Sequence, residues 1–258
     1  MKKFKALAII ASFLLVYTGS VSGQEYKLDL SSGKIRINEV HKVTIEGHNE
    51  NFVLISTTDR GHHNSERARG LRPINSLGLE DNSGIGLAVD KTGNEVEINS
   101  VSRHRNSRYT ILVPKDVTIS YQNSSNHGGP LQIKNVQSEL DVTVRFNSVH
   151  LENVSGPMTI NTVHGKIEAV FSQVSQKSPI SLVSAHGLID VALPADTKAK
   201  LRLSSDHGEI FSDMKIEYEK SGGLHKISSS HVNGSLNGGG IDIRLSSNHG
   251  NIYLRTKK

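Results

Sequence analysis

The sequence predicts an all-β protein built as an elongated β-solenoid, a β-helix-like stack of short strands. Apolar and polar residues alternate in many runs of four or five residues, which is typical of half-buried strands. A short phrase with Ser, His and Gly recurs about every 21 residues, for example from His186 to His207. A repeat of this length indicates stacked units that cannot bury their apolar faces alone. Aromatic residues are only 5% of the chain and tryptophan is absent, which favours a thin aliphatic core.

Residues 1–23 are expected to be a signal peptide and not part of the fold. Three lysines precede the apolar run 6–16, and the small residues of 19–23 precede a predicted cleavage before Gln24. The apolar run is short for a membrane span. We therefore expect one β-repeat domain over 24–258. The mature chain is predicted to be soluble, without a transmembrane segment, and to lie in the periplasm, the cell envelope or outside the cell.

Composition limits the classes of partner. The net charge is +5, and the three lysines of the signal account for three of these charges, which leaves about +2 for 24–258. An exported, nearly neutral chain with few aromatic residues is not expected to bind nucleic acid. The chain has no cysteine, so disulfides and sulfur-ligated metals are excluded. Two basic clusters, 60–72 and 103–108, are interpreted as solvated loops, with acidic glycans or lipid head groups as the alternative ligands.

Successive copies are expected to lie directly over one another along 24–258, so that distance along the chain equals height along the stack. The part 24–108 is less regular, with a long polar loop at 59–72, although Ser32-Gly33-Lys34-Ile35 echoes the later phrase without its histidine. The part 109–258 is clearly repetitive. There, Pro130, Pro157 and Pro179 each come just before an alternating run, which is a position that tolerates proline.

The repeated phrase reads Ser-x-His-Gly-x-Ile or a close variant. Its histidines are separated by 14 to 42 residues, with most spacings near 21 to 23. The glycine is interpreted as a corner residue that needs a positive φ. The phrase contributes copies at 125–128, 162–167, 184–189, 205–210 and 247–252, and a degenerate copy is assigned to Ser148-Val149-His150-Leu151.

These residues resemble a known family. Repeats of the form Ser-x-x-Gly-x-Ile, preceded by phrases such as Leu112-Val113-Pro114 and Ala192-Leu193-Pro194, are similar to the putative-adhesin β-strand-repeat proteins, a domain of unknown function in exported bacterial proteins. The stretch 82–87 is also typical of that family. The resemblance implies a β-solenoid in the bacterial envelope or outside the cell, with no catalytic residues to carry over. Histidine at the turn departs from the family's usual small polar residue.

If the copies stack in register, their histidines lie along one edge. Two readings of this edge are open: a structural ladder of turns, which we favour, and a zinc or copper site, because imidazoles are common metal ligands. Either reading predicts sensitivity to acid, since protonated neighbours would repel each other. The candidate metal ligands are His127, His164, His186, His207 and His249, and His150 is expected at the same edge.

A polysaccharide-active enzyme on a β-helix is a further alternative. Such enzymes need paired carboxylates, and Glu168, Asp190, Glu209 and Asp242 follow or flank the repeated strands. Their alternation with apolar residues indicates ordinary outward positions, and no catalytic motif accompanies them. We therefore predict a non-enzymatic, adhesin-like scaffold or binding surface that needs no cofactor and meets envelope glycans or proteins.

Overall fold

The computed structural model describes residues 24–58, 70–71, 78–101, 107–126, 128–218 and 230–258. The expected signal, most of the polar loop 59–72, residues 103–106 of the second basic cluster and His127 lie outside these residues. Within them every regular element is a strand, so the all-β prediction is confirmed. No helix in the described part of the chain has the length and apolar character required to cross a membrane.

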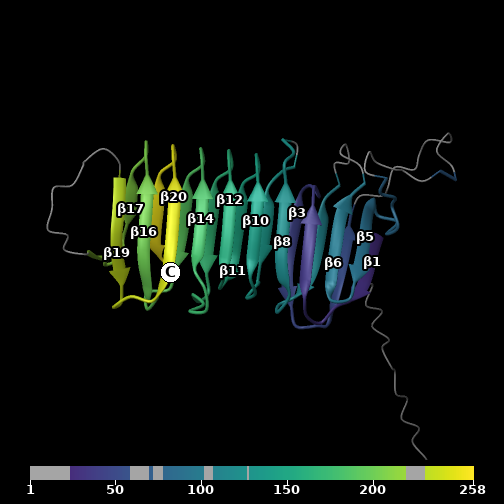
Figure 1. Ribbon diagram of the computed structural model, residues 1–258, viewed down its shortest axis with the longest axis horizontal. Helices are drawn as coiled ribbons and strands as arrows, with labels where there is room; N and C mark the ends of the chain where they lie inside the picture. The colour runs from purple at the N-terminus through teal and green to yellow at the C-terminus, as the bar shows by residue number, and fades with distance from the viewer. Residues whose placement is uncertain (1–23, 59–69, 72–77, 102–106, 127, 219–229) are drawn as a thin grey trace, which may run out of the picture.

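In the described residues, twenty-one strands form two long sheets that pack face to face (Figure 1). In spatial order, the ten strands of sheet A are β1 (Gln24–Asp29), β4 (Phe52–Thr57), β7 (Tyr109–Pro114), β3 (Val43–His48), β9 (Leu131–Lys134), β11 (Val149–Val154), β13 (Ile167–Phe171), β15 (Ile189–Leu193), β21 (Ile252–Thr256) and β17 (Ile210–Ser212). The eleven strands of sheet B are β18 (Glu217–Tyr218), β19 (Ser230–Leu236), β16 (Ala199–Ser205), β20 (Ile241–Ser247), β14 (Ile180–Ser184), β12 (Met158–Thr162), β10 (Leu140–Val144), β8 (Thr118–Asn123), β2 (Lys34–Asn38), β6 (Glu95–Ser100) and β5 (Leu87–Thr92).

One coil of the solenoid is a strand of sheet B followed by a strand of sheet A, for example β12 then β13. Neighbouring coils pair in parallel and in register, as Met158 does with Ile180 and Ile167 with Ile189. Antiparallel strands close the stack: β1 pairs with β4 and β5 with β6 at one end, and β19 pairs with β16 and β18 at the other. At the fourth sheet end, β17 is the edge strand of sheet A and pairs in parallel with β21.

The order of coils departs from the order of the chain at both ends. The last coil, β20–β21, lies between β14–β15 and β16–β17, and the first, β2–β3, lies between β6–β7 and β8–β9. The expectation that distance along the chain equals height along the stack is therefore wrong at these two places. The insertion has a physical benefit, because β20 pairs with both β14 and β16 and leaves neither of its edges open.

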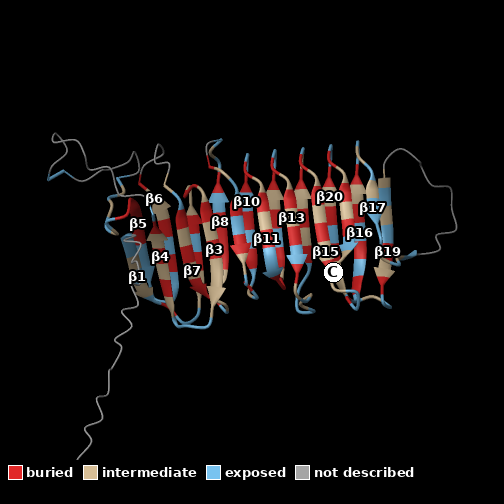
Figure 2. Cartoon of the chain, turned by 180° about the vertical axis from the view of Figure 1, so that it is seen from behind, coloured by how far each residue is buried: buried red, intermediate tan, exposed pale blue. Residues whose placement is uncertain are grey.

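The core is a set of aliphatic ladders between the sheets, and its residues are the buried positions, coloured red, that alternate along most strands in Figure 2. Residues that follow one another in register differ little in shape, so each layer fits the next. One ladder of sheet B runs through Ile119, Leu140, Met158, Ile180, Ile243 and Leu201. Tyr121 is one of the largest buried side chains, and its hydroxyl donates to the carbonyl of Val40 at 2.6 Å. Burial raises the pKa of Tyr121, so this ring stays uncharged.

Proline and the early echo of the repeat lie where the sequence analysis expected strands to begin. Pro130, Pro157 and Pro179 each precede the first residue of a strand. Lys34 and Ile35 begin β2, which pairs with β8 in the same parallel ladder as the later coils. The echo leads into sheet B, however, whereas the histidine phrases lead into sheet A. Alternation predicts strands well, but it does not say which sheet a strand joins.

Candidate functional site

The repeated serine closes the turn from sheet B to sheet A and joins neighbouring coils. Ser184 is fully buried, and its Oγ accepts a hydrogen bond from the backbone N–H of Gly187 at 2.8 Å. The same hydroxyl donates to the carbonyl of Gly165 in the adjacent coil at 3.1 Å. Ser247 and Ser205 repeat both bonds at 2.8 to 3.0 Å. The serine is therefore a structural part of the phrase.

The repeated glycine is needed for close approach and not for a positive φ. Positive φ values occur at ten other glycines, and those of the phrase are not among them, so the corner interpretation is wrong. A Cβ on Gly187 would lie 2.0 Å from the carbonyl oxygen of Gly165. On Gly165 and Gly250 it would lie 1.8 Å and 2.3 Å from the corresponding carbonyl of the adjacent coil. The backbones touch here, which leaves no room for a side chain.

The histidines of the phrase stack into a continuous column on the exposed rim of the turns. In spatial order, neighbouring ring centroids are 4.9 Å apart for His164 and His186, 4.8 Å for His186 and His249, and 4.8 Å for His249 and His207. The interplanar angles are 6° to 29°. The predicted common edge therefore exists for these four residues. We call them, together with Phe146, the ring column.

Phe146, and not His150, occupies the histidine position of the degenerate copy. The ring of Phe146 stacks on His164 at 5.2 Å, so Val144-Arg145-Phe146-Asn147 is the true counterpart of Ser-x-His-Gly. The copy assigned to Ser148-Val149-His150 is wrong by register, because Val149 pairs with Ile167, the last position of the phrase. His150 consequently points from the outer face of β11 and does not join the column.

The geometry of the column does not favour a shared metal. The ring planes are nearly parallel, and an imidazole lone pair lies in its ring plane, so neighbouring lone pairs run side by side instead of converging. Within the described residues there is no group of three or more His, Asp and Glu side chains that could hold a metal ion. Nδ1 of His249 also lies 3.3 Å from the carbonyl oxygen of Ala185, which is a structural contact. Metal binding remains a prediction for experiment.

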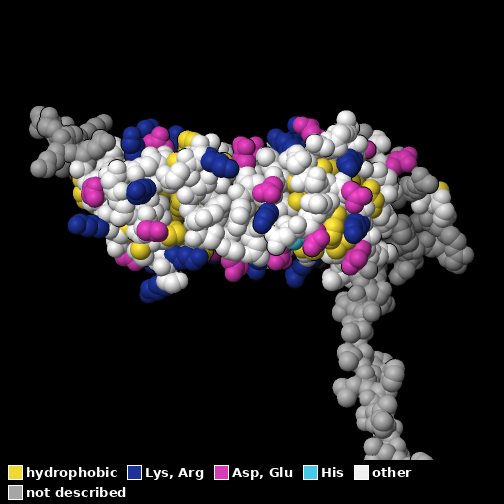
Figure 3. Space-filling model, turned by 90° about the horizontal axis from the view of Figure 1, so that it is seen from below, with side chains coloured by type: hydrophobic (Ala, Val, Ile, Leu, Met, Phe, Trp, Pro, Cys, Tyr) yellow, Lys and Arg dark blue, Asp and Glu magenta, His cyan; other side chains and the backbone are white. Residues whose placement is uncertain are grey.

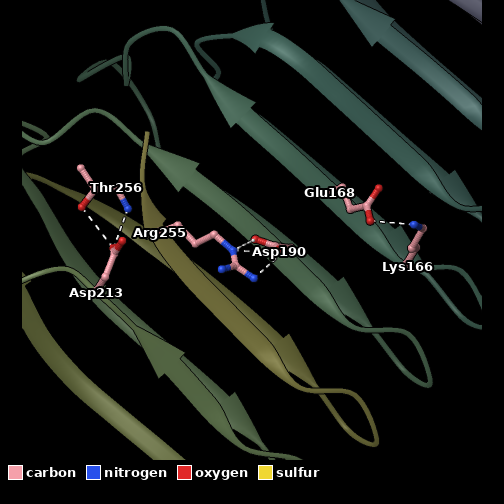
Figure 4. A network of polar contacts seen from close by, with 6 residues as sticks. All are labelled: Lys166, Glu168, Asp190, Asp213, Arg255 and Thr256. Carbon is pink, nitrogen blue, oxygen red and sulfur yellow. Dashed lines mark hydrogen bonds and ion pairs between the residues drawn. The ribbon is translucent and has the colours of Figure 1, made fainter. Parts of the chain in front are cut away.

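The outer face of sheet A carries a second row of aligned side chains, which differ from coil to coil. Register places one outward residue of each strand beside the next. We call this set the face row: Gln132, His150, Glu168, Asp190, Tyr253 and Phe211. Asp190 accepts two hydrogen bonds from Arg255, at 2.8 Å and 3.0 Å (Figure 4). Tyr253 and Phe211 stack at 5.3 Å.

A shallow groove of about 330 Å³ lies over the face row at β9, β11 and β13. Nδ1 of His150 is 2.6 Å from a carboxylate oxygen of Glu168, and Nζ of Lys166 is 2.6 Å from the other (Figure 4 shows the Lys166 contact). Burial raises the pKa of Glu168, but the hydrogen bond from Lys166 and the charges of His150 and Lys166 outweigh it and lower the pKa below its usual value. Glu168 is therefore an anion held by two fixed partners.

The carboxylates proposed for the enzyme alternative divide between the sheets. Glu168 and Asp190 are directly paired on β13 and β15. Asp242 lies on sheet B, where it faces Arg202 at 3.5 Å, and Glu209 is an exposed residue before β17. Glu168 and Asp190 are each engaged by a cation, which is typical of structural ion pairs on a strand surface. Charges of both signs are also interspersed over the view in Figure 3, which indicates no single-sign surface there.

Comparison with known proteins identifies the family. The model of the Toastrack DUF4097 family matches residues 113–255. The chain belongs to this family. The resemblance to adhesin-like repeat proteins of unknown function and the solenoid prediction are thereby confirmed. No curated protein sequence matches the chain. A solved structure, that of a putative cell adhesion protein from Clostridium sporogenes ATCC 15579, is 12% identical, covers 91% of this chain and 100% of its own, and has a TM-score of 0.49.

Proposed function

We propose that the protein is an exported, non-enzymatic, adhesin-like binding protein of the cell envelope. In this proposal the outer face of sheet A meets envelope glycans or proteins, and the rest of the solenoid is the scaffold. The observation that carries the proposal is the face row with its groove at His150 and Glu168. There, side chains differ at every coil although the backbone repeats.

The rigidity of the strands supports a binding role. Each face-row residue is fixed by parallel pairing on both sides, except at the edge strand β17. Side chains therefore stand one strand apart, about 4.8 Å, without depending on loops for their position. A site on rigid strands loses little conformational freedom when a ligand binds.

The ionic contacts of the face also favour binding over catalysis. Glu168 is held by Lys166 and His150, and Asp190 by Nε and Nη2 of Arg255. A general acid in a glycosidase needs a raised pKa, whereas that of Glu168 is lowered. We therefore assign no reaction to Glu168 and Asp190.

The proposal is tested by expressing the whole chain in a bacterial host. The secreted or periplasmic form is expected to begin at Gln24 by intact mass, and to sediment with insoluble envelope material. The comparison protein is the double variant Glu152→Lys with Val170→Lys, which changes the groove and should remain in the supernatant. A cytoplasmic, uncleaved chain, or equal sedimentation of both proteins, would contradict the proposal.

Metal binding through the four histidines of the ring column is the second candidate, and its one supporting observation is that these imidazoles share an edge. It predicts that zinc or copper raises the melting temperature of the whole chain. Because His186 neighbours His249 and not His207, the informative variant is His186→Ala with His249→Ala. A shift that is present in the wild type and absent in this variant would establish the metal reading. We expect no shift in either.

A further inference from the structure

The groove at β11 and β13 combines polar groups of both kinds with an apolar side chain. Glu152 and Glu168 offer acceptor oxygens, whereas Gln132 and Lys134 offer N–H donors. Val170 lies among them with 39% of its surface exposed. A pyranose ring has the same division, because its hydroxyls point outward around the ring and its C–H bonds cover the two faces. The groove is thus chemically complementary to a sugar.

The cations beside the groove are each paired with a carboxylate of the protein. Lys134 pairs with Glu152 at 3.1 Å, Lys166 with Glu168 at 2.6 Å, and Arg255 with Asp190 at 2.8 Å. Each of these three cations therefore has a carboxylate partner. The imidazole of His150 also contacts a carboxylate, that of Glu168. An anionic sugar would have to break one of these pairs to obtain a cation. An uncharged sugar can use the same groups as hydrogen-bond partners without breaking any.

The dimensions fit a single sugar unit within a longer chain. A volume of about 330 Å³ is at the lower end of the range for small-molecule sites. Beyond the groove the face row continues in register through Asp190 and Tyr253 to Phe211, whose side chain is exposed on the outer face of the edge strand β17. A linear polymer leaving the groove along the stack would meet a new side chain at every strand.

We propose that the groove around His150 and Glu168 binds one uncharged sugar unit of a linear polysaccharide, which extends along the face row toward Tyr253 and Phe211. This inference rests on the proposed function and names its ligand class and its binding residues. His150 is a positioning residue in this account: its Nδ1 is occupied by Glu168, which fixes the ring beside the groove.

The test is affinity electrophoresis of the whole chain through gels that contain one soluble polysaccharide each. The probes are an uncharged glucan, an uncharged N-acetylhexosamine polymer and a uronic acid polymer. The variant is Val170→Lys, which fills the groove with a charged side chain at an exposed strand position. The matched control is Val183→Lys, an outward valine at the corresponding kind of position on sheet B. A second variant, Glu152→Gln, keeps the shape and removes one carboxylate.

At least one uncharged polysaccharide is expected to retard the wild type and Val183→Lys. Val170→Lys should lower the affinity at least tenfold, and Glu152→Gln severalfold, at unchanged melting temperature. Equal retardation of Val170→Lys and the wild type, or retardation by the uronic acid polymer alone, would overturn the inference. If no uncharged polymer retards a chain that still sediments with envelope material, the ligand class is wrong and the proposed function stands. If the wild-type chain also fails to sediment with envelope material, the result contradicts the proposed function itself.

Discussion

The turn edge and the outer face of sheet A use the same stacked backbone in opposite ways. At the edge, Ser, His and Gly return in successive coils and make the same contacts each time, as Ser184 and Ser247 do. On the face, each coil contributes a different residue, from Gln132 to Phe211. Repetition builds the column, whereas variation along the face row supplies the surface that a ligand recognises in the function we propose.

The largest effect on stability is expected from a substitution at a glycine of the turn edge. Gly187→Ala should destabilise the protein by on the order of 4 kcal/mol or prevent folding, since the new Cβ meets the carbonyl of Gly165 at 2.0 Å. Gly93→Ala is the matched control, because its φ is +60° with nothing within 4 Å of the added atom, and it should cost about 1 kcal/mol. Urea unfolding measures both. Similar losses in the two variants would contradict the close-packing account.

The serine of the edge should have the next largest effect. Ser184→Ala leaves the N–H of Gly187 and the carbonyl of Gly165 without this buried partner, which is expected to cost roughly 2 kcal/mol. Ser184→Thr should restore most of the loss, because in the adjacent coil Oγ1 of Thr162 accepts the equivalent hydrogen bond from the N–H of Gly165 at 2.9 Å. If thermal unfolding does not distinguish alanine from threonine, the hydroxyl does not join the coils.

The histidines of the ring column should affect stability mainly in acid. His249→Phe keeps an aromatic ring at the position, as Phe146 does naturally, but removes a charge between two neighbours at 4.8 Å. Each charged pair costs about 0.9 kcal/mol in water before salt screening. We therefore expect stability within about 0.5 kcal/mol of the wild type at neutral pH and a smaller loss of stability than in the wild type on acidification, measured by urea unfolding. A variant that loses as much stability as the wild type on acidification would show that ring repulsion plays no part.

The smallest effect is expected on the face, at Glu168. Its pKa is lowered in the folded protein, so its ionised form contributes stability above the usual carboxyl range, and this contribution is lost as pH falls. Glu168→Gln should therefore be less stable than the wild type at pH 7 by less than about 1 kcal/mol, because the side chains are partly exposed, and equal to it near pH 3. A difference that grows toward low pH would have the wrong sign for this account.

The sequence predicts the features that recur in successive coils, but it does not predict those that differ from coil to coil. Strand alternation and the Ser-x-His-Gly spacing predicted the solenoid and the edge that His164, His186, His249 and His207 share. The groove was not predicted, because a row of unlike residues carries no local signal. His150 was misassigned since Ser148-Val149-His150 matches the phrase by letters, whereas the true copy at Phe146 shares none of them. Only the run Leu140–Val144, which ends just before that turn, could have shown the correct register.

The insertion of β20–β21 between earlier coils was also beyond the sequence pattern. Local alternation specifies that these residues form strands, but not which edges they join. The choice depends on pairing between residues about 40 to 65 positions apart, such as Ser205 and Ser247 or Ile180 and Ile243. In energetic terms the inserted coil satisfies two edges at once, which is a property of the assembled stack and not of the segment.

The most direct test of the central claim measures stability and binding in the same two variants of the whole chain. Ser247→Ala changes the edge, and Tyr253→Ser with Phe211→Ser changes the face. The account predicts that the edge variant has a lower melting temperature and still sediments with envelope material. The face variant should keep nearly the wild-type melting temperature and sediment less. The reverse pattern, or an edge variant that loses binding while fully folded, would contradict it.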